Sequence, residues 1–200
     1  MSRSELRRER NRDFFINAAR SIVESEGLQA LTIRKVSEMA GYSAASVYNY
    51  FGSMNSLLNA VKDSYAVDIM KYISQSHYTE SDPVKKLEHS YRAFAEYFLQ
   101  KPEIFRLIFM SQVGRGEFNP DELPNFLDMG ETRMSLFLEV AKENGLRDEV
   151  VTTIENTLSA MLFGNLYFYN FGLTDMSPEL LLQLITNNVS FLFETLGGKR

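Results

Sequence analysis

The chain has 200 residues, 44% of them hydrophobic, which is enough for one or two compact domains with a buried core. Because it contains no cysteine, disulfides and thiolate metal sites are excluded, and we expect a cytoplasmic protein. The net charge of −5 argues against general binding to polyanions. The charge is uneven, however. Residues 1–62 carry nine Lys or Arg and six Asp or Glu, whereas residues 63–200 carry twelve and twenty, so a basic head precedes an acidic body.

The first fifteen residues are rich in arginine rather than apolar, so we expect no signal peptide and no membrane anchor. No run approaches the ~18 apolar residues of a membrane-spanning helix. The arginines of this arm suit a DNA backbone or minor groove, although three acidic residues dilute them and a solvated disordered tail is the alternative. They are Arg3, Arg7, Arg8, Arg10 and Arg12. A first helix follows, from about Ser4 or Arg8 to Glu26. Its expected inner face consists of Phe14, Ala18, Ala19, Ile22 and Val23.

Residues 31–58, LTIRKVSEMAGYSAASVYNYFGSMNSLL, predict two short helices around a turn and then a third helix. Thr32 is a helix cap, Gly41 permits the sharp turn, and Ser43 caps the next helix. That helix buries Val47 and Phe51, and its other side is small and almost uncharged: Ala44, Ala45, Ser46, Tyr48 and Asn49. Such a face fits a major groove about 12 Å wide. The pattern indicates a helix-turn-helix. The alternative is a helical hairpin packed on another helix.

The motifs of this segment resemble the TetR family of transcriptional regulators. They are Leu31-Thr32-Ile33, Ala40-Gly41 followed by Ser43, Val47-Tyr48, Tyr50-Phe51 and Leu57-Leu58, with Ala18-Ala19 and Gly27-Leu28 upstream. The resemblance covers residues 10–61, and the rest of the chain is similar only in being all-helical. It implies an all-α protein with a three-helix DNA-binding domain over residues 1–53 and a helical ligand-binding and dimerisation domain over residues 54–200. The DNA-binding residues are then Thr32, Arg34, Ser43, Ala44, Ala45, Ser46, Tyr48, Asn49 and Tyr50. The chain departs from the family at Met54, where a phosphate-binding lysine is usual.

The remaining helices are predicted from their start and stop signals. Ser53 caps a long helix to about Ser76, shared between head and body. Asp82 and Pro83 begin another helix, which ends at Lys101 before Pro102. The further expected elements are a buried segment over 103–113, a loop over 114–124, and helices over 125–144, 148–171 and 178–196.

The last two helices are apolar on more than one side, which a single core does not need. A second subunit is the simplest cover, and a monomer with a thick core is the alternative. The resemblance likewise implies a homodimer in which the last two helices of each subunit form a four-helix interface. Two recognition helices related by a two-fold axis would read a palindrome with half-sites about 34 Å apart.

Fifteen Phe, ten Tyr and nine Met exceed what packing requires, and such residues line ligand pockets. Each of them can also be plain core. The predicted cavity residues are Phe105, Phe109, Met134, Phe137, Phe163 and Tyr167, with His89, Glu96, Gln112 and Asn165 as polar candidates. This lining suits an apolar or flat aromatic effector. By resemblance, the effector shifts the long shared helix and releases the operator.

We expect no enzyme, cofactor or metal site. His77 and His89 are the only histidines, and neither has a metal-ligand spacing. The segment 114–116 lacks the context of a dinucleotide loop. We interpret the chain as a transcriptional repressor that binds a double-stranded operator and is released by a small molecule. The alternatives are a ligand-independent DNA binder and a ligand-binding module with weakened operator affinity, which Met54 favours.

Overall fold

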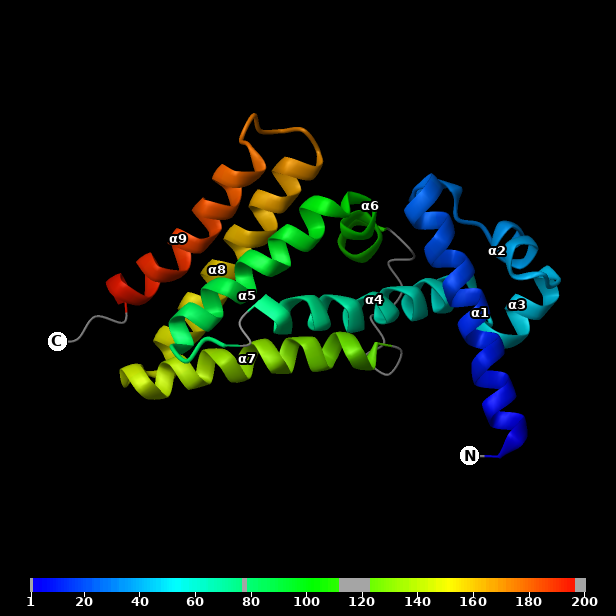
Figure 1. The fold of residues 1–200 in the computed structure, drawn as a ribbon, viewed down its shortest axis with the longest axis horizontal. Helices are drawn as coiled ribbons and strands as arrows, with labels where there is room; N and C mark the ends of the chain where they lie inside the picture. The colour runs from blue at the N-terminus through cyan, green and yellow to red at the C-terminus, as the bar shows by residue number, and fades with distance from the viewer. Residues whose placement is uncertain (1, 77–78, 112–122, 197–200) are drawn as a thin grey trace. The chain divides into compact units, whose positions relative to one another are not determined.

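The computed structural model describes residues 2–76, 79–111 and 123–196, and within these ranges all regular structure is helical (Figure 1). The chain forms two compact units. The first comprises Met1–Val67 and Glu103–Leu127, and the second comprises Asp68–Pro102 and Asp128–Arg200. The predicted boundary between residues 53 and 54 coincides with the start of helix α4 (Met54–Ser76), whereas the division into units falls inside that helix. The all-α fold class predicted from the sequence is confirmed.

The first unit is built around three N-terminal helices: α1 (Arg3–Glu26), α2 (Ile33–Ala40) and α3 (Ala44–Phe51). A short turn, η1 (Leu28–Ala30), connects α1 to α2. This unit also holds the first part of α4, most of α6 (Pro102–Phe105), and the π-helical turn η2 (Arg106–Met110). The Glu103 carboxylate accepts a 3.2 Å hydrogen bond from the backbone N–H of Leu28, which ties α6 to η1.

Helix α1 begins earlier than the sequence predicted, and a different phenylalanine lies on its buried side. Ser2 and Glu5 form a capping box, so the arginine arm is helical from Arg3 and is not a disordered tail. The prediction of Phe14 on the inner face is wrong, because its side chain is 56% exposed while Phe15 is fully buried. Both positions satisfy helical spacing to the buried alanines at 18 and 19. The packing of α2 and α3 against α1 selects Phe15.

The second unit is dominated by α5 (Pro83–Gln100), α8 (Asp148–Asn170) and α9 (Pro178–Leu196), which pack on one another, together with most of α7 (Pro124–Asn144). These bounds agree with the predicted helices to within one residue. The predicted segment 103–113 corresponds to α6 and η2 as far as residue 110. Most of the predicted loop over 114–124 lies outside the described residues.

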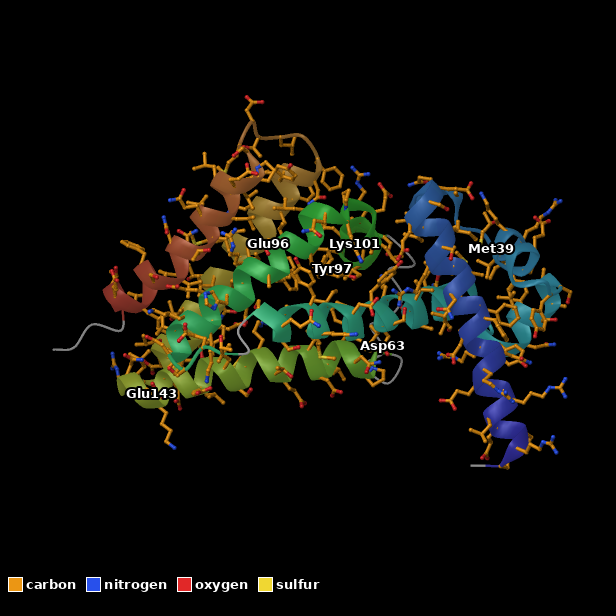
Figure 2. All side chains as sticks on the ribbon, in the orientation of Figure 1. Met39, Asp63, Glu96, Tyr97, Lys101 and Glu143 are labelled. Atoms are coloured by element: carbon orange, nitrogen blue, oxygen red, sulfur yellow. The ribbon has the colours of Figure 1, made fainter. Side chains whose placement is uncertain are left out.

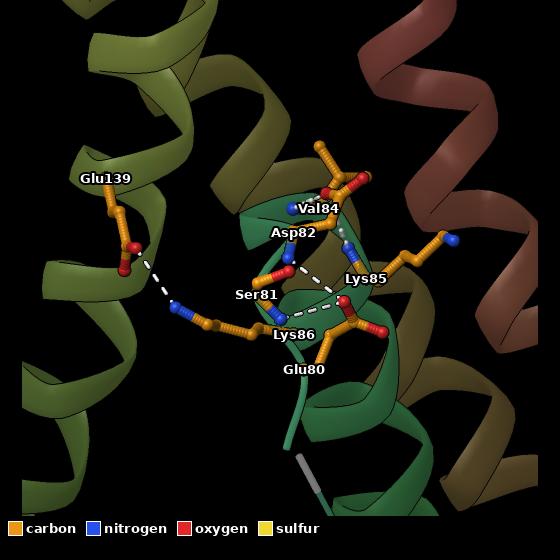
Figure 3. Close-up of polar contacts among 7 residues, drawn as sticks. All are labelled: Glu80, Ser81, Asp82, Val84, Lys85, Lys86 and Glu139. Atoms are coloured by element: carbon orange, nitrogen blue, oxygen red, sulfur yellow. Dashed lines mark hydrogen bonds and ion pairs between the residues drawn. The ribbon is translucent and has the colours of Figure 1, made fainter. Parts of the chain in front are cut away.

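The start of α5 shows why its sequence signal was reliable (Figure 3). The Asp82 carboxylate accepts hydrogen bonds from the backbone N–H groups of Val84 at 2.8 Å and Lys85 at 3.3 Å. Asp82 therefore satisfies two amides that have no partner within the helix. One turn further on, Lys86 pairs with Glu139 of α7 at 3.1 Å, which joins α5 to α7.

Candidate functional site

Helix α2 and its turn provide the rigid frame of the helix-turn-helix. The Thr32 hydroxyl accepts a 3.2 Å hydrogen bond from the Lys35 N–H, so Thr32 caps α2 as predicted. Gly41 adopts the left-handed conformation with φ 75° and ψ 30°, which confirms the turn assigned to it. Leu31 and Val36, on either side of the cap, are both buried. The start of α2 and the turn into α3 are therefore set by local sequence.

Helix α3 has one buried and one exposed side, as its pattern predicts. Ser43 caps it by accepting a 3.2 Å hydrogen bond from the Ser46 N–H. Val47 and Phe51 point into the unit and are buried. The outer face exposes Ala44, Ala45, Tyr48 and Asn49 and half-exposes Ser46. We call these five side chains the outer face of α3. They offer methyl, hydroxyl and amide groups of the kind that contact base edges in a major groove.

Tyr50, also predicted to contact DNA, lies apart from the outer face. Its ring is half-buried, with its centroid 5.4 Å from that of Phe15 on α1. The side-chain amide of Asn11 donates a 2.9 Å hydrogen bond to the Tyr50 hydroxyl. Sequence reasoning missed Asn11, because its partner lies 39 residues away and no local motif connects them.

The predicted DNA contact Arg34 is exposed at the start of α2 and pairs with Glu38 one turn later at 2.8 Å. The hydrogen bond that Arg34 donates to Glu38, together with the negative charge of Glu38, raises the pKa of Arg34. Lys35 forms a further ion pair with Glu26 of α1. Acidic neighbours therefore partly balance the positive charge along α2.

The arginine arm lies close to the recognition helix. The guanidinium of Arg8 is 5.8 Å from the ring centre of Tyr50, and that of Arg12 is 5.1 Å from the ring centre of Phe51. A helix about 10–12 Å wide does not enter a minor groove about 6 Å wide. In its helical form the arm is therefore suited to phosphates rather than to the floor of the minor groove.

Met54 is the first residue of α4 and is half-buried. The hydroxyl of Ser53 accepts a 3.1 Å hydrogen bond from the N–H of Ser56, so Ser53 caps α4 as predicted. Met54 therefore stands at a helix N-terminus, whose amides attract anions.

The predicted ligand-binding residues are divided between the two units. In the first unit, Phe105 is buried and its ring centre lies 5.2 Å from that of Phe109. The ring centre of Phe109 in turn lies 6.4 Å from that of Phe126. Gln112, a polar candidate, lies outside the described residues, as does His77. That all the predicted ligand-binding residues line one shared cavity stays a prediction.

In the second unit, Phe137 is fully buried and Phe163 lies 6.0 Å from Phe94, centre to centre. Met134 and Tyr167 are exposed. Four polar candidates were predicted, and three of them have described surroundings. Asn165 donates to the carbonyl of Met161 in its own helix, Glu96 pairs with Arg92, and His89 Nδ1 is buried without a hydrogen-bond partner among the described residues.

A polar cluster that sequence reasoning missed lies inside the second unit. Arg133 of α7 pairs with Glu155 of α8 at 2.8 Å and donates to the hydroxyl of Ser159 at 3.1 Å. Burial raises the pKa of the nearby Tyr91 to about 12, although Arg133 and Ser159 both act to lower it. Within the described ranges, neither the Tyr91 hydroxyl nor Arg133 Nε has a hydrogen bond of acceptable geometry. Unsatisfied buried polar groups are costly and suggest a missing partner.

Asp63 connects α4 to the first turn of α7 within the first unit (Figure 2). Its carboxylate accepts a 2.6 Å hydrogen bond from the side-chain amide of Asn125 and a 3.2 Å hydrogen bond from the backbone N–H of Phe126. Asp63 is buried, so these bonds replace its hydration. The position of α4 and the start of α7 are thereby coupled.

Large apolar side chains of α8 and α9 point outward from this single chain. Phe168 is 52% exposed and Phe191 is 61% exposed. The set, which we call the α8–α9 apolar face, consists of Tyr167, Phe168, Phe171, Leu180, Phe191 and Leu196. Large exposed apolar side chains of this kind make α8 and α9 a candidate interaction surface. Separately, no described helix is both long and apolar enough to span a bilayer.

An exposed recognition helix in an N-terminal helix-turn-helix, followed by a larger set of helices, defines a class of helical DNA-binding regulators. Residues 15–61 match the family model described as bacterial regulatory proteins, tetR family. This match confirms the resemblance to the TetR family seen in the sequence of this segment. No curated protein sequence matches the chain.

Solved structures show the same fold over nearly the whole length. A TetR family transcription regulator from Marinobacter aquaeolei VT8 is 18% identical with a TM-score of 0.66, covering 94% of this chain and 97% of that one. RolR in complex with resorcinol is 17% identical with a TM-score of 0.68, over 98% and 96% of the two chains. Thermus thermophilus FadR, a TetR family transcriptional repressor in complex with lauroyl-CoA, is 17% identical with a TM-score of 0.66, over 94% and 95%. At these identities the likeness concerns the fold alone.

Proposed function

We propose that the protein is a transcriptional repressor that binds a palindromic operator as a homodimer and leaves it when a small molecule binds. The observation that carries the proposal is the outer face of α3, which is largely exposed and has no charged side chain. A helix with such a face enters a major groove and reads bases through hydroxyl, amide and methyl groups. We place this activity in the cytoplasm, and we propose no catalytic role.

Dimerisation through α8 and α9 is supported by the α8–α9 apolar face and by Gly164. Gly164 lies inside α8, where glycine costs roughly 1 kcal/mol of helix stability relative to alanine. A Cβ added at this position meets no atom within 4 Å, so packing among the described residues does not require glycine there. Close approach of a partner helix accounts for it. The dimer then presents two copies of α3 to two half-sites.

For the effector, we propose an apolar or aromatic molecule that carries an oxygen atom. The rings of Phe137 and Tyr91, 6.2 Å apart, offer apolar contact. Among the residues that the structure describes, the Tyr91 hydroxyl and Arg133 Nε have no hydrogen-bond partner, so an oxygen of the effector would satisfy them. Arg133 is already paired with Glu155, which favours a neutral group over an anion. The compared RolR structure contains resorcinol, a neutral aromatic molecule with hydroxyl groups, which fits this class. The lauroyl-CoA of the compared FadR structure shares only its apolar acyl chain with this class, because its coenzyme A part is anionic.

The dimer releases the operator if the effector binds more tightly to a conformation in which α4 has shifted. In that conformation the distance between the two copies of α3 no longer matches the spacing of the half-sites. A difference of a few kcal/mol between the two states suffices to empty the site. Asp63 supports this role, since its hydrogen bonds couple α4 to the start of α7.

The deciding experiment is fluorescence anisotropy with the full chain, a labelled duplex from upstream of its own gene, and an unrelated duplex of equal length at the same salt concentration. We expect the upstream duplex to bind about 10³-fold or more tightly. Equal affinities would contradict operator recognition and favour the ligand-binding module. Specific binding that no apolar or aromatic compound reverses would favour the ligand-independent DNA binder.

A further inference from the structure

We infer that Asn11 of α1 is a positioning residue for DNA binding: it bridges Tyr42 and Tyr50 and turns the Tyr50 hydroxyl into a hydrogen-bond donor for a DNA phosphate. The inference rests on the proposed binding of DNA by the helix-turn-helix. It concerns a contact to the DNA backbone, which is separate from base reading by the outer face of α3.

The bridge consists of two hydrogen bonds made by one side-chain amide. Asn11 Nδ2 donates to the Tyr50 hydroxyl at 2.9 Å, and the Tyr42 hydroxyl donates to Asn11 Oδ1 at 3.3 Å. Tyr42 lies in the turn just before the cap of α3, and Tyr50 lies in the last turn of α3. Asn11 therefore holds both ends of the recognition helix from α1.

The direction of these bonds determines what Tyr50 can do next. A tyrosine hydroxyl carries one proton and also accepts hydrogen bonds. Because the Tyr50 oxygen accepts from Asn11, the bridge does not use the proton of Tyr50. Tyr42, by contrast, uses its proton in the bond to Asn11. A phosphate only accepts hydrogen bonds, so Tyr50 has the polarity that a phosphate contact requires.

The surroundings fix the position of this hydroxyl. The ring centre of Phe15 lies 5.0 Å from that of Tyr42 and 5.4 Å from that of Tyr50, so both rings pack against the same buried side chain. Tyr50 is half-buried, which leaves part of it accessible. The Arg8 guanidinium, 5.8 Å from the Tyr50 ring centre, adds positive charge where a phosphate would bind.

A purely structural Asn11 would stabilise the first unit without acting through Tyr50. The two roles differ in a double-mutant cycle of DNA affinity, which isolates the coupling between the two side chains. The cycle uses Asn11→Ala, Tyr50→Phe and the double variant in the full chain. Asn17→Ala is the matched control, because Asn17 is an exposed asparagine on the same helix. Thermal unfolding of each variant measures stability separately.

We expect Asn11→Ala and Tyr50→Phe each to weaken binding about three- to tenfold, the scale of one hydrogen bond. In the Tyr50→Phe background, Asn11→Ala should have almost no further effect. Asn11→Asp should weaken binding more than Asn11→Ala, because a carboxylate only accepts and so takes the proton of Tyr50. Asn17→Ala should bind like the original protein.

The cycle is measured on the upstream duplex and, at low salt, on the unrelated duplex. A phosphate contact carries no base information, so the losses should be similar on both. This separates the inference from the proposed function: equal wild-type affinity for the two duplexes contradicts operator recognition, while the cycle still reports on Asn11. Additive losses from Asn11→Ala and Tyr50→Phe, or a loss no larger than that of Asn17→Ala, would overturn the inference.

Discussion

Tyr48 and Ser46 are the two side chains of the outer face of α3 best suited to test base reading. Tyr48 is 51% exposed, whereas Ser46 is half-buried and its hydroxyl lies 3.0 Å from that of Ser43. We expect Tyr48→Ala or Ser46→Ala to lower operator affinity by about 1–3 kcal/mol, the scale of one specific contact. Anisotropy measures the loss, and circular dichroism checks the fold. Unchanged affinity in both variants would refute the placement of this face in the groove.

Met54 tests whether the N-terminus of α4 faces the DNA backbone. Replacing it with lysine adds an ammonium group to a helix end that already attracts anions. Met54→Lys should tighten binding to operator and unrelated DNA by similar factors and steepen the plot of log affinity against log salt by about one contact. Salt titrations of both proteins on one duplex measure this slope. An unchanged slope would mean that Met54 packs inside the unit and faces away from DNA.

At the scale of elements, helix ends were predictable because their signals are local. Asp82 before Pro83 and the glycine at 41 each act within four residues, so the sequence alone indicates where the helices begin and turn. The choice between Phe14 and Phe15 was not local, since it depends on which side of α1 meets α2 and α3. The bridge from Asn11 to Tyr50 and the pair of Arg133 and Glu155 likewise exist only once separate helices pack together.

A substitution of Asp63 tests whether its hydrogen bonds hold the start of α7 to α4. Asp63→Asn replaces one accepting oxygen with a donor, so one of its two bonds to residues 125 and 126 is lost inside the unit. We expect the free energy of unfolding to fall by roughly 1–3 kcal/mol. Chemical denaturation measures this change, with Asp13→Asn, an exposed aspartate on α1, as the control. Equal and small effects of both substitutions would show that Asp63 does not hold α7.

At the scale of the whole molecule, the proposed function requires two copies of the chain. The sequence indicated this need through two helices with apolar residues on more than one side, and the structure leaves part of that surface exposed as the α8–α9 apolar face. Sequence reasoning did not separate these outward residues from core residues such as Leu166 and Ile185, which are buried within the chain. That distinction depends on how α5, α8 and α9 pack.

The α8–α9 apolar face predicts how a charge would act on assembly. Phe168→Asp or Phe191→Asp places a carboxylate on a surface that we expect to be buried between subunits, and an unpaired buried charge is strongly destabilising. At least one variant should dissociate to monomers or precipitate. Because the two half-sites are then no longer bound together, a soluble monomeric variant should also lose most of its operator affinity.

Analytical ultracentrifugation measures the assembly, and Leu173→Asp, an exposed apolar position outside the helices, serves as the control. A wild-type protein that sediments as a monomer at micromolar concentration would refute this interface.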